Sequence, residues 1–163
     1  MTDADPAVRS SLRSSLAIAA VVVFVDQITK RWALNALADG QPHHVIWTLQ
    51  WNLTFNRGMA FSTGEGVGPI IGALAVVVVV VMLLSLRQSG GRITTVAVGL
   101  VVGGAVGNIL DRMFRERGWL RGRVIDFIDF QWFPIFNIAD MAINVGGVLL
   151  VLTALFRPRA KAQ

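Results

Sequence analysis

The sequence predicts an all-α membrane protein with four transmembrane helices and a small β element between the first two helices. Hydrophobic residues make up 54% of the 163 residues and charged residues only 15%, a balance that is unlike that of a soluble domain. Some apolar runs, such as Ala75 to Leu84, contain no polar side chain. No repeat or low-complexity tract divides the chain, so we expect residues 1–163 to form a single integral membrane domain.

Four apolar stretches have roughly the length of a membrane span: Leu12–Leu37, Val67–Leu86, Thr94–Leu110 and Asn137–Phe156. A helix of about 20 residues crosses the hydrocarbon core of about 30 Å. The second and fourth stretches fit this length, and the third is slightly short. The first is uninterrupted only from Leu16 to Val25, so its length depends on an amphipathic continuation. A cleaved signal peptide is the alternative for the first stretch. We favour a helix, because Asp26 and Lys30 occur where small residues would mark a cleavage site.

Four spans place both termini on one side of the membrane and the first and third connections on the other. Positive charge does not orient the chain, since seven of the fifteen lysines and arginines fall on the side of the termini and eight on the other. All five tryptophans fall on the side of the first and third connections: Trp32, Trp47, Trp51, Trp119 and Trp132. Tryptophan favours the headgroup layer, so we expect the functional surface on that side.

The first connection has the pattern of a strand or hairpin. Every second residue from Val45 to Phe55 is apolar, and from Thr48 to Asn56 these residues alternate with polar ones, a period of two that gives one apolar face. That face could lie on the bilayer or pack on the helix ends, and the two readings are compatible. Asn56, Arg57 and Gly58 follow, where the glycine permits a sharp turn and the other two offer hydrogen-bond donors.

The third stretch combines close-packing glycines with polar residues at its end. Its glycines are Gly99, Gly103, Gly104 and Gly107, and small residues at such spacing let membrane helices approach closely. Asn108, Asp111 and Arg112 follow and share one side of the helix. An Asp with a nearby Arg is more often a structural ion pair than a catalytic group, and the same holds for Asp26 and Lys30, four residues apart.

Two further aspartates suggest a reaction. Asp126 lies in Val-Ile-Asp-Phe, and Asp140 lies at the mouth of the fourth stretch, where Asn137 and Asn144 share its helix face. An ionisable group at the edge of a bilayer is a functional-site hypothesis by default. Carboxyl groups that share a site do not both ionise easily, so one keeps a proton while the other acts as a base, as in aspartic proteases.

Other chemistries are less well supported by the composition. The chain has no cysteine, which excludes a thiol nucleophile, a disulfide and a thiolate metal site. His43 and His44 are adjacent without a third ligand at metal-binding spacing, so we expect no metal and no cofactor. The net charge of +5 is scattered over both sides, which favours anionic lipid headgroups over nucleic acid as a partner.

The sequence resembles the signal peptidase II family, the lipoprotein signal peptidases. Five motifs occur in the family's order: Asp26 with Lys30; Asn56-Arg57-Gly58 with Phe61; Gly103 through Asn108 to Arg112; Val124-Ile125-Asp126-Phe127; and Phe136-Asn137-Ile138-Ala139-Asp140. The chain departs from the family pattern at Phe114 to Gly122, an arginine-rich insert, and in the short stretch from Asp126 to Asp140. These departures bear on loop shape rather than on the aspartates.

The resemblance implies an aspartic endopeptidase of the bacterial inner membrane, with cytoplasmic termini and with the β element and active site near the extracytoplasmic face. Its substrates would be prolipoproteins with a diacylglyceryl group on a cysteine, cut just before that cysteine. Asp126 and Asp140 would be catalytic. The residues implied to bind substrate or support the dyad are Asp26, Lys30, Asn56, Arg57, Gly58, Asn108, Asp111, Arg112 and Asn137. We expect a monomer whose partners are lipidated prolipoproteins and membrane lipids.

Two functions from other classes remain as alternatives. A small proton-coupled transporter would also bring carboxyl groups to membrane depth, but it should show internal repeats and place these groups near the midplane. A non-enzymatic membrane subunit would explain the spans and glycines but not two aspartates and three asparagines at one level.

Overall fold

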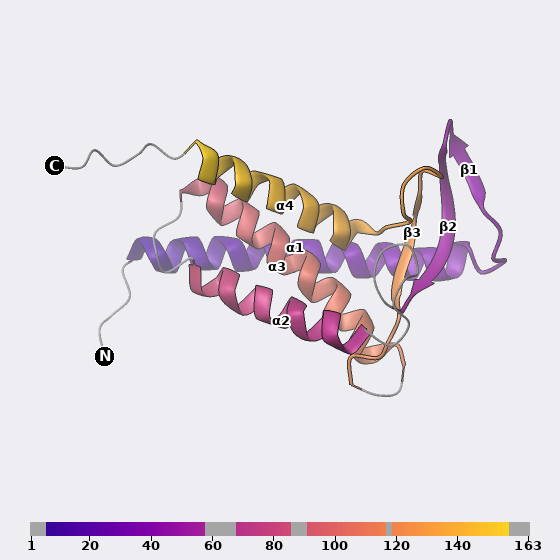
Figure 1. The fold of residues 1–163 in the computed structure, drawn as a ribbon, viewed down its shortest axis with the longest axis horizontal. Helices are drawn as coiled ribbons and strands as arrows, with labels where there is room; N and C mark the ends of the chain where they lie inside the picture. Colours follow the sequence, from indigo (N-terminus) through magenta and orange to yellow (C-terminus); the bar gives the residue numbers. More distant parts are fainter. Residues whose placement is uncertain (1–5, 58–67, 86–90, 117–118, 157–163) are drawn as a thin grey trace.

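Four helices and three strands make up the computed structural model, which describes residues 6–57, 68–85, 91–116 and 119–156. The helices are α1 (Pro6–Ala36), α2 (Gly68–Ser85), α3 (Arg92–Phe114) and α4 (Ile138–Leu155). They run along the long axis of the molecule, and a small sheet lies across the end where α1 finishes and α4 begins (Figure 1). This arrangement agrees with the predicted fold class.

The helix lengths differ in part from the sequence prediction. By length and composition, α1, α3 and α4 are long and apolar enough to cross a membrane, whereas α2 counts as a shorter apolar helix over Pro69–Ser85. The 18 residues of α2 rise about 27 Å, close to the thickness of the hydrocarbon core. The expectation that the third stretch is slightly short is wrong, because α3 has 23 residues and includes the polar positions after Leu110.

The first helix is the longest of the four, although its sequence gave the weakest indication of a span. It has 31 residues, begins at Pro6 and continues without interruption through Asp26 and Lys30. Both charged side chains are completely buried, at 0% exposure. Hydropathy alone undervalues this part of the helix, because it counts these charges as if they faced lipid.

Glycines allow α1 and α4 to pack closely on α3, which lies between them. A Cβ atom at Gly103 would lie 2.8 Å from the backbone oxygen of Ala19 on α1, and one at Gly107 would lie 2.6 Å from the Asp26 carboxylate. On the other side of α3, a Cβ at Gly104 would collide with the backbone oxygen of Ala139 on α4. The predicted packing role of these glycines is confirmed.

The sheet contains one strand more than the sequence predicts. Strands β1 (His43–Ile46) and β2 (Leu49–Asn56) form the predicted hairpin, and β3 (Val124–Asp129), from the connection between α3 and α4, pairs antiparallel with β2. The sheet order is β1-β2-β3. Thr54 pairs with Asp126 in this register, so the hairpin and the aspartate are fixed relative to each other.

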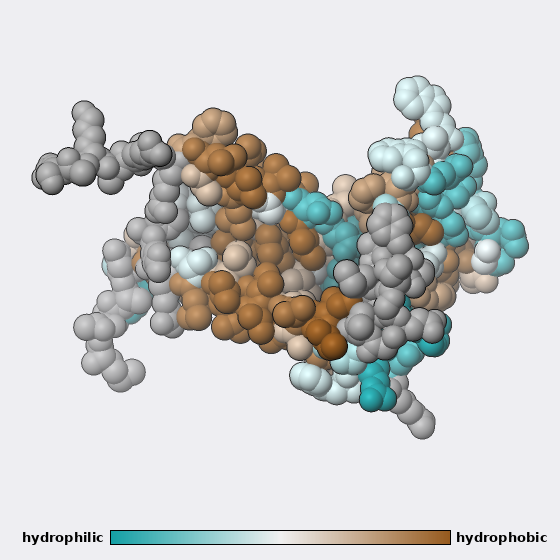
Figure 2. Space-filling view, in the orientation of Figure 1, coloured by the Kyte–Doolittle hydropathy of each residue, from teal (hydrophilic) through white to brown (hydrophobic). Residues whose placement is uncertain are grey.

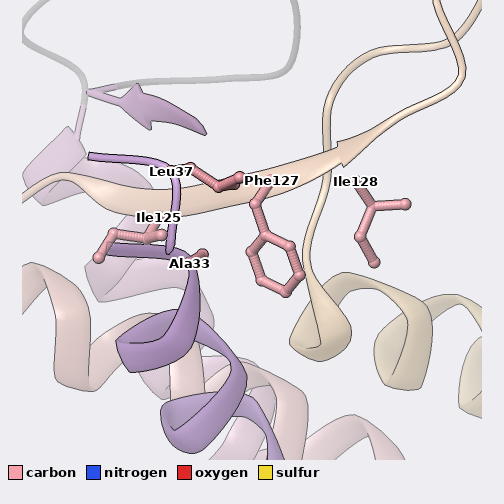
Figure 3. Packing of buried hydrophobic residues seen from close by; sticks show 5 residues of the cluster. All are labelled: Ala33, Leu37, Ile125, Phe127 and Ile128. Carbon is pink, nitrogen blue, oxygen red and sulfur yellow. The ribbon is translucent and has the colours of Figure 1, made fainter. Parts of the chain in front are cut away.

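A small apolar core holds the sheet on the end of α1. Ala33 and Leu37 lie next to Ile125, Phe127 and Ile128 of β3, and all five are buried (Figure 3). Of the two readings of the apolar face, the structure therefore shows that β2 and β3 pack on the end of α1. On β1, Val45 and Ile46 remain exposed, so contact with the bilayer is still available to that edge.

The surface divides into an apolar and a polar part. In the space-filling view, hydrophobic residues cover the helical part of the face shown, whereas hydrophilic residues concentrate at the sheet end and in the hollow between the sheet and the helices (Figure 2). The apolar part corresponds to the surface that a membrane would cover.

Candidate active site

Asp126 and Asp140 come from different layers of the structure and face the same cavity. Asp126 lies within β3, and Asp140 lies in the first turn of α4. The cavity has a volume of about 540 Å³ and opens between α2, α3, α4 and the segment before α4. Its polar lining consists of Asn56, Asn108, Arg112, Asp126, Asp140 and Asn144. Its apolar lining includes Ile71, Ala75 and Val78 of α2 and Phe133, Pro134 and Ile135 before α4.

Two asparagine side chains donate to the Asp126 carboxyl group. Asn56 Nδ2 lies 3.2 Å from Oδ2, and Asn137 Nδ2 lies 2.6 Å from Oδ1. Burial of Asp126, together with the charge of Asp140, raises its pKa to about 7, and the two donated hydrogen bonds offset this only in part. A buried carboxyl group that titrates near neutrality can exchange a proton with a substrate.

Asp140 accepts hydrogen bonds from Asn137, which also contacts Asp126, and from a further asparagine, Asn108. Asn108 Nδ2 donates to its Oδ1 at 2.8 Å, and the backbone N–H of Asn137 donates to its Oδ2 at 3.2 Å. Asn137 is also the N-cap of α4, since its side-chain oxygen accepts from the Asp140 N–H at 2.9 Å. This reciprocal capping box fixes Asp140 at the start of the helix. Asn137 thus contacts both carboxyl groups.

A buried lysine sets the orientation of the Asn108 amide. Lys30 Nζ donates to Asn108 Oδ1 at 2.9 Å. With its oxygen turned toward the ammonium group, Asn108 presents its NH₂ group to Asp140. Lys30 forms ion pairs with Asp26 at 2.9 Å and with Asp111 at 2.8 Å, and all three side chains are completely buried. The expected pair of Asp26 and Lys30 is confirmed, and it belongs to a larger network.

The same network connects α1 to the start of α4. Asp26 Oδ1 accepts the backbone N–H of Ala139 at 3.0 Å, one residue before Asp140. Gln27 Nε2 donates to the other oxygen of Asp26 at 3.1 Å and to the backbone oxygen of Gly107 at 3.2 Å. These bonds hold the first turn of α4 at a fixed position against α1 and α3.

Asp111 and Arg112 have different surroundings. Asp111 forms its ion pairs with Lys30 and with Arg115, whose Nε lies 2.5 Å from Oδ1. Its other oxygen accepts the backbone N–H of Ile125 at 3.3 Å, directly before Asp126. Arg112 instead lines the cavity, where its charge acts on Asp126 and Asp140. The charge of Asp111 acts on Arg112 as well, so the structure adds further neighbours to the predicted pair.

The Asn-Arg-Gly motif contributes a single residue to the carboxyl cluster in the described part of the chain. Asn56 contacts Asp126, but the Arg57 guanidinium lies 3.9 Å from the Glu116 carboxylate and is half exposed. Gly58 lies outside the described residues, as does Phe61.

Asp129 is held apart from the cavity. It accepts hydrogen bonds from Gln50 Nε2 at 2.7 Å, Asn52 Nδ2 at 2.9 Å and the Gln131 backbone N–H at 2.6 Å. Burial would raise the pKa of this carboxyl group, but the three hydrogen bonds outweigh burial and lower it. Successive side chains in a strand alternate between its two faces. Asp129 follows Asp126 by three residues in β3, so the two side chains point to opposite faces.

Two contributors to this site were not predicted from the sequence. Gln27 follows Asp26 directly after the apolar run that ends at Val25. A second polar residue at this position could have indicated a role beside Asp26. The cavity wall formed by Phe133, Pro134 and Ile135 carried no such sign. Within the described ranges, no cluster of three or more His, Cys, Asp or Glu side chains is arranged to hold a metal ion.

Comparison with known proteins agrees with this geometry. Residues 18–156 match the family model described as signal peptidase (SPase) II. The lipoprotein signal peptidase of Mycolicibacterium smegmatis is 41% identical over 146 residues, which cover 89% of this chain and 62% of the relative. That of Mycobacterium tuberculosis (strain H37Rv) is 39% identical over 152 residues, covering 93% and 75% respectively. The chain therefore spans less than two thirds of the length of the first relative. It spans three quarters of the length of the second.

Solved structures of bacterial membrane enzymes share the fold. One, determined by the in meso method at 2.3 Å resolution, superposes with a TM-score of 0.75 at 27% identity and covers 91% of this chain and 94% of its own. Another, at 1.9 Å resolution, gives a TM-score of 0.71 at 28% identity. The fold is thus that of a class of bacterial membrane enzymes. This chain belongs to the signal peptidase II family.

Proposed function

We propose that the protein is an aspartic endopeptidase that removes the signal peptide from diacylglyceryl-modified bacterial prolipoproteins and cuts just before the lipidated cysteine. The observation that carries the proposal is the shared surroundings of Asp126 and Asp140. Both line one cavity, and both accept hydrogen bonds from Asn137. Membership of the signal peptidase II family supports the substrate class.

In the proposed mechanism, the two carboxyl groups carry one proton between them. The ionised group takes a proton from a water molecule while the water oxygen attacks the scissile carbonyl carbon, and the protonated group donates its proton to the carbonyl oxygen. The tetrahedral intermediate then collapses, the C–N bond breaks and the leaving amine takes up a proton from the pair. Because the groups are coupled, the apparent pKa values belong to the pair.

The cavity lining suggests how a lipidated substrate would sit. Its polar end contains the dyad with Asn56 and Arg112, and its apolar side is formed by Ile71 and Val78 of α2. The peptide backbone would lie at the polar end, and the acyl chains would follow the apolar side into the lipid. We propose that the termini are cytoplasmic, that the dyad lies near the extracytoplasmic face of the inner membrane, and that a monomer acts without a metal.

The test is a cleavage assay on purified protein with a lipidated precursor and the same precursor without its lipid. Asp126→Asn and Asp140→Asn should each reduce turnover by at least about a thousandfold, and the double variant should be little worse, because the pair acts as a unit. Asp129→Asn provides the matched control in the same strand, and it should retain most activity because Asp129 contacts Gln50 and Asn52 instead of the cavity. The unlipidated precursor should be cut far more slowly, since two acyl chains anchor the peptide in the membrane.

Each outcome bears on one part of the proposal. Activity in both Asp126→Asn and Asp140→Asn would show that the protein is no aspartic peptidase. An inactive Asp129→Asn beside an active Asp126→Asn would move the dyad to another aspartate. Equal cleavage of the two precursors would contradict the substrate class while leaving the mechanism in place.

A further inference from the structure

A second groove runs along the outer face of α1 and α3 and shares no lining residue with the active-site cavity. It has a volume of about 660 Å³. Its apolar lining is Leu16, Ala19, Ala20, Val23, Phe24, Ile28, Val102 and Val106. Only Gln27 and Arg31 add polar atoms, and both lie toward the sheet end of α1. From Leu16 to Ile28 the groove follows α1 for about 18 Å, longer than half of a hydrocarbon core of about 30 Å.

Two smaller cavities continue this groove toward the sheet. One of about 450 Å³ shares Gln27 and Arg31 with the apolar groove and adds Asp111 and Arg115. The next, of about 480 Å³, shares Arg115 with it and reaches the sheet. The shared residues make a single path that is apolar along the helices and lined by arginine at the end nearest the sheet.

Positive charge exceeds negative charge at that end. Three arginines line it (Arg31, Arg115 and Arg123) against two carboxylates, Asp111 and Glu116. Asp111 is already bound by Lys30 and Arg115, and Glu116 pairs with Arg123. Arg31 is exposed, and its side chain forms no hydrogen bond or ion pair with any other residue in the described ranges. The groove therefore ends at a guanidinium group whose charge is not balanced locally.

We propose that this groove binds an anionic phospholipid, with an acyl chain along α1 and α3 and its phosphate at Arg31 and Arg115. Guanidinium groups are well suited to phosphate, and a basic residue at the headgroup layer attracts an anionic lipid. The diacylglyceryl group of the proposed substrate fits less well, because it is attached to a thioether and carries no phosphate. The bound lipid would pack against the helices that hold Asp26 and Asp111.

The test measures lipid retention by native mass spectrometry of the purified protein. The probes are phosphatidylglycerol and phosphatidylcholine with identical acyl chains. The wild type should retain phosphatidylglycerol about fivefold better, the effect of roughly one basic residue near the surface. Arg31→Gln should abolish this preference, whereas Arg13→Gln should keep it, because Arg13 lies on the same helix at the opposite end. Ala20→Phe should fill the groove and reduce retention of both lipids.

Four results would overturn the inference. Three of them are equal retention of the two lipids by the wild type, an unchanged preference in Arg31→Gln, and unchanged retention of both lipids in Ala20→Phe. A fourth is displacement of phosphatidylglycerol by the lipidated precursor, which would make the groove part of the substrate site. No arm of the retention experiment with phospholipids alone requires peptidase activity, so the inference and the proposed function fail independently.

Discussion

Asn137 is connected to both catalytic candidates. Its side chain donates to Asp126 and to Asn108, its backbone N–H donates to Asp140, and its side-chain oxygen caps α4. The cap and the donation to Asp126 use different atoms of one amide. Structural and chemical roles of this residue can therefore be separated by substitution.

We expect Asn137→Ser to preserve folding but not turnover. Serine is a good N-cap, so the melting temperature should stay near that of the wild type, whereas Asn137→Ala should lose about 1 kcal/mol of stability. Both variants lose the amide donor to Asp126 and should be at least about tenfold slower at saturating substrate. Melting curves and kcat values for the two variants test this. A serine variant with wild-type turnover would show that the amide donor is dispensable.

The pKa of Asp126 leads to a prediction about pH. Burial, together with Asp140, raises this pKa to about 7. The active dyad needs one proton, so turnover should fall as the pH rises through about 7 and remove it. Asn56→Ala removes a hydrogen bond that lowers the pKa, so the alkaline fall in its residual activity should move to higher pH. Profiles of kcat from pH 5.5 to 9 for both proteins measure the shift. A flat profile, or a shift to lower pH, would contradict this assignment.

At the scale of elements, segments with a clear hydrophobic period could be predicted from the sequence, and segments without one could not. The alternation that ends at Asn56 predicted a strand or hairpin, and the structure shows the hairpin β1–β2. In β3 every residue from Val124 to Asp129 is buried, so no alternation marks it as a strand. The five motifs indicated the residues of the candidate site, but the contacts of Lys30 with Asp111 and Asn108 could not be predicted, because they depend on the rotation of α1 against α3.

The close contact between α3 and α4 predicts a strong effect of a single methyl group. A Cβ at Gly104 would collide with the backbone oxygen of Ala139, so Gly104→Ala must push α4, and with it Asp140, away from α3. We expect lower thermal stability and at least about a tenfold loss of activity. Gly147→Ala on α4 is the matched control, because its Cβ would have no neighbour within 4 Å, and it should be neutral or slightly stabilising. Equal behaviour of the two variants would rule out this packing.

At the scale of the whole molecule, the sheet and the candidate dyad lie at one end of an apolar helical body (Figures 1 and 2). Reporter fusions after Arg57 and Arg121 should be extracytoplasmic, and fusions after Gln88 and Arg159 should be cytoplasmic. Alkaline phosphatase and green fluorescent protein fusions at the same four sites provide opposite readouts. The inverted pattern would place the dyad on the cytoplasmic face and contradict the proposed substrate access.

The complete burial of Lys30 also constrains how the newly made chain matures. The helices enter the membrane in the order of their synthesis, and at first the ammonium group of α1 has a carboxylate only from its own helix, Asp26. Its remaining acceptors, Asp111 and Asn108, belong to α3, and Asn108 is made 78 residues later. An unsatisfied charge does not settle into hydrocarbon, so α1 reaches its final depth only when α3 arrives. Under the proposed mechanism, hydrolysis then also requires α4, because that helix brings Asp140.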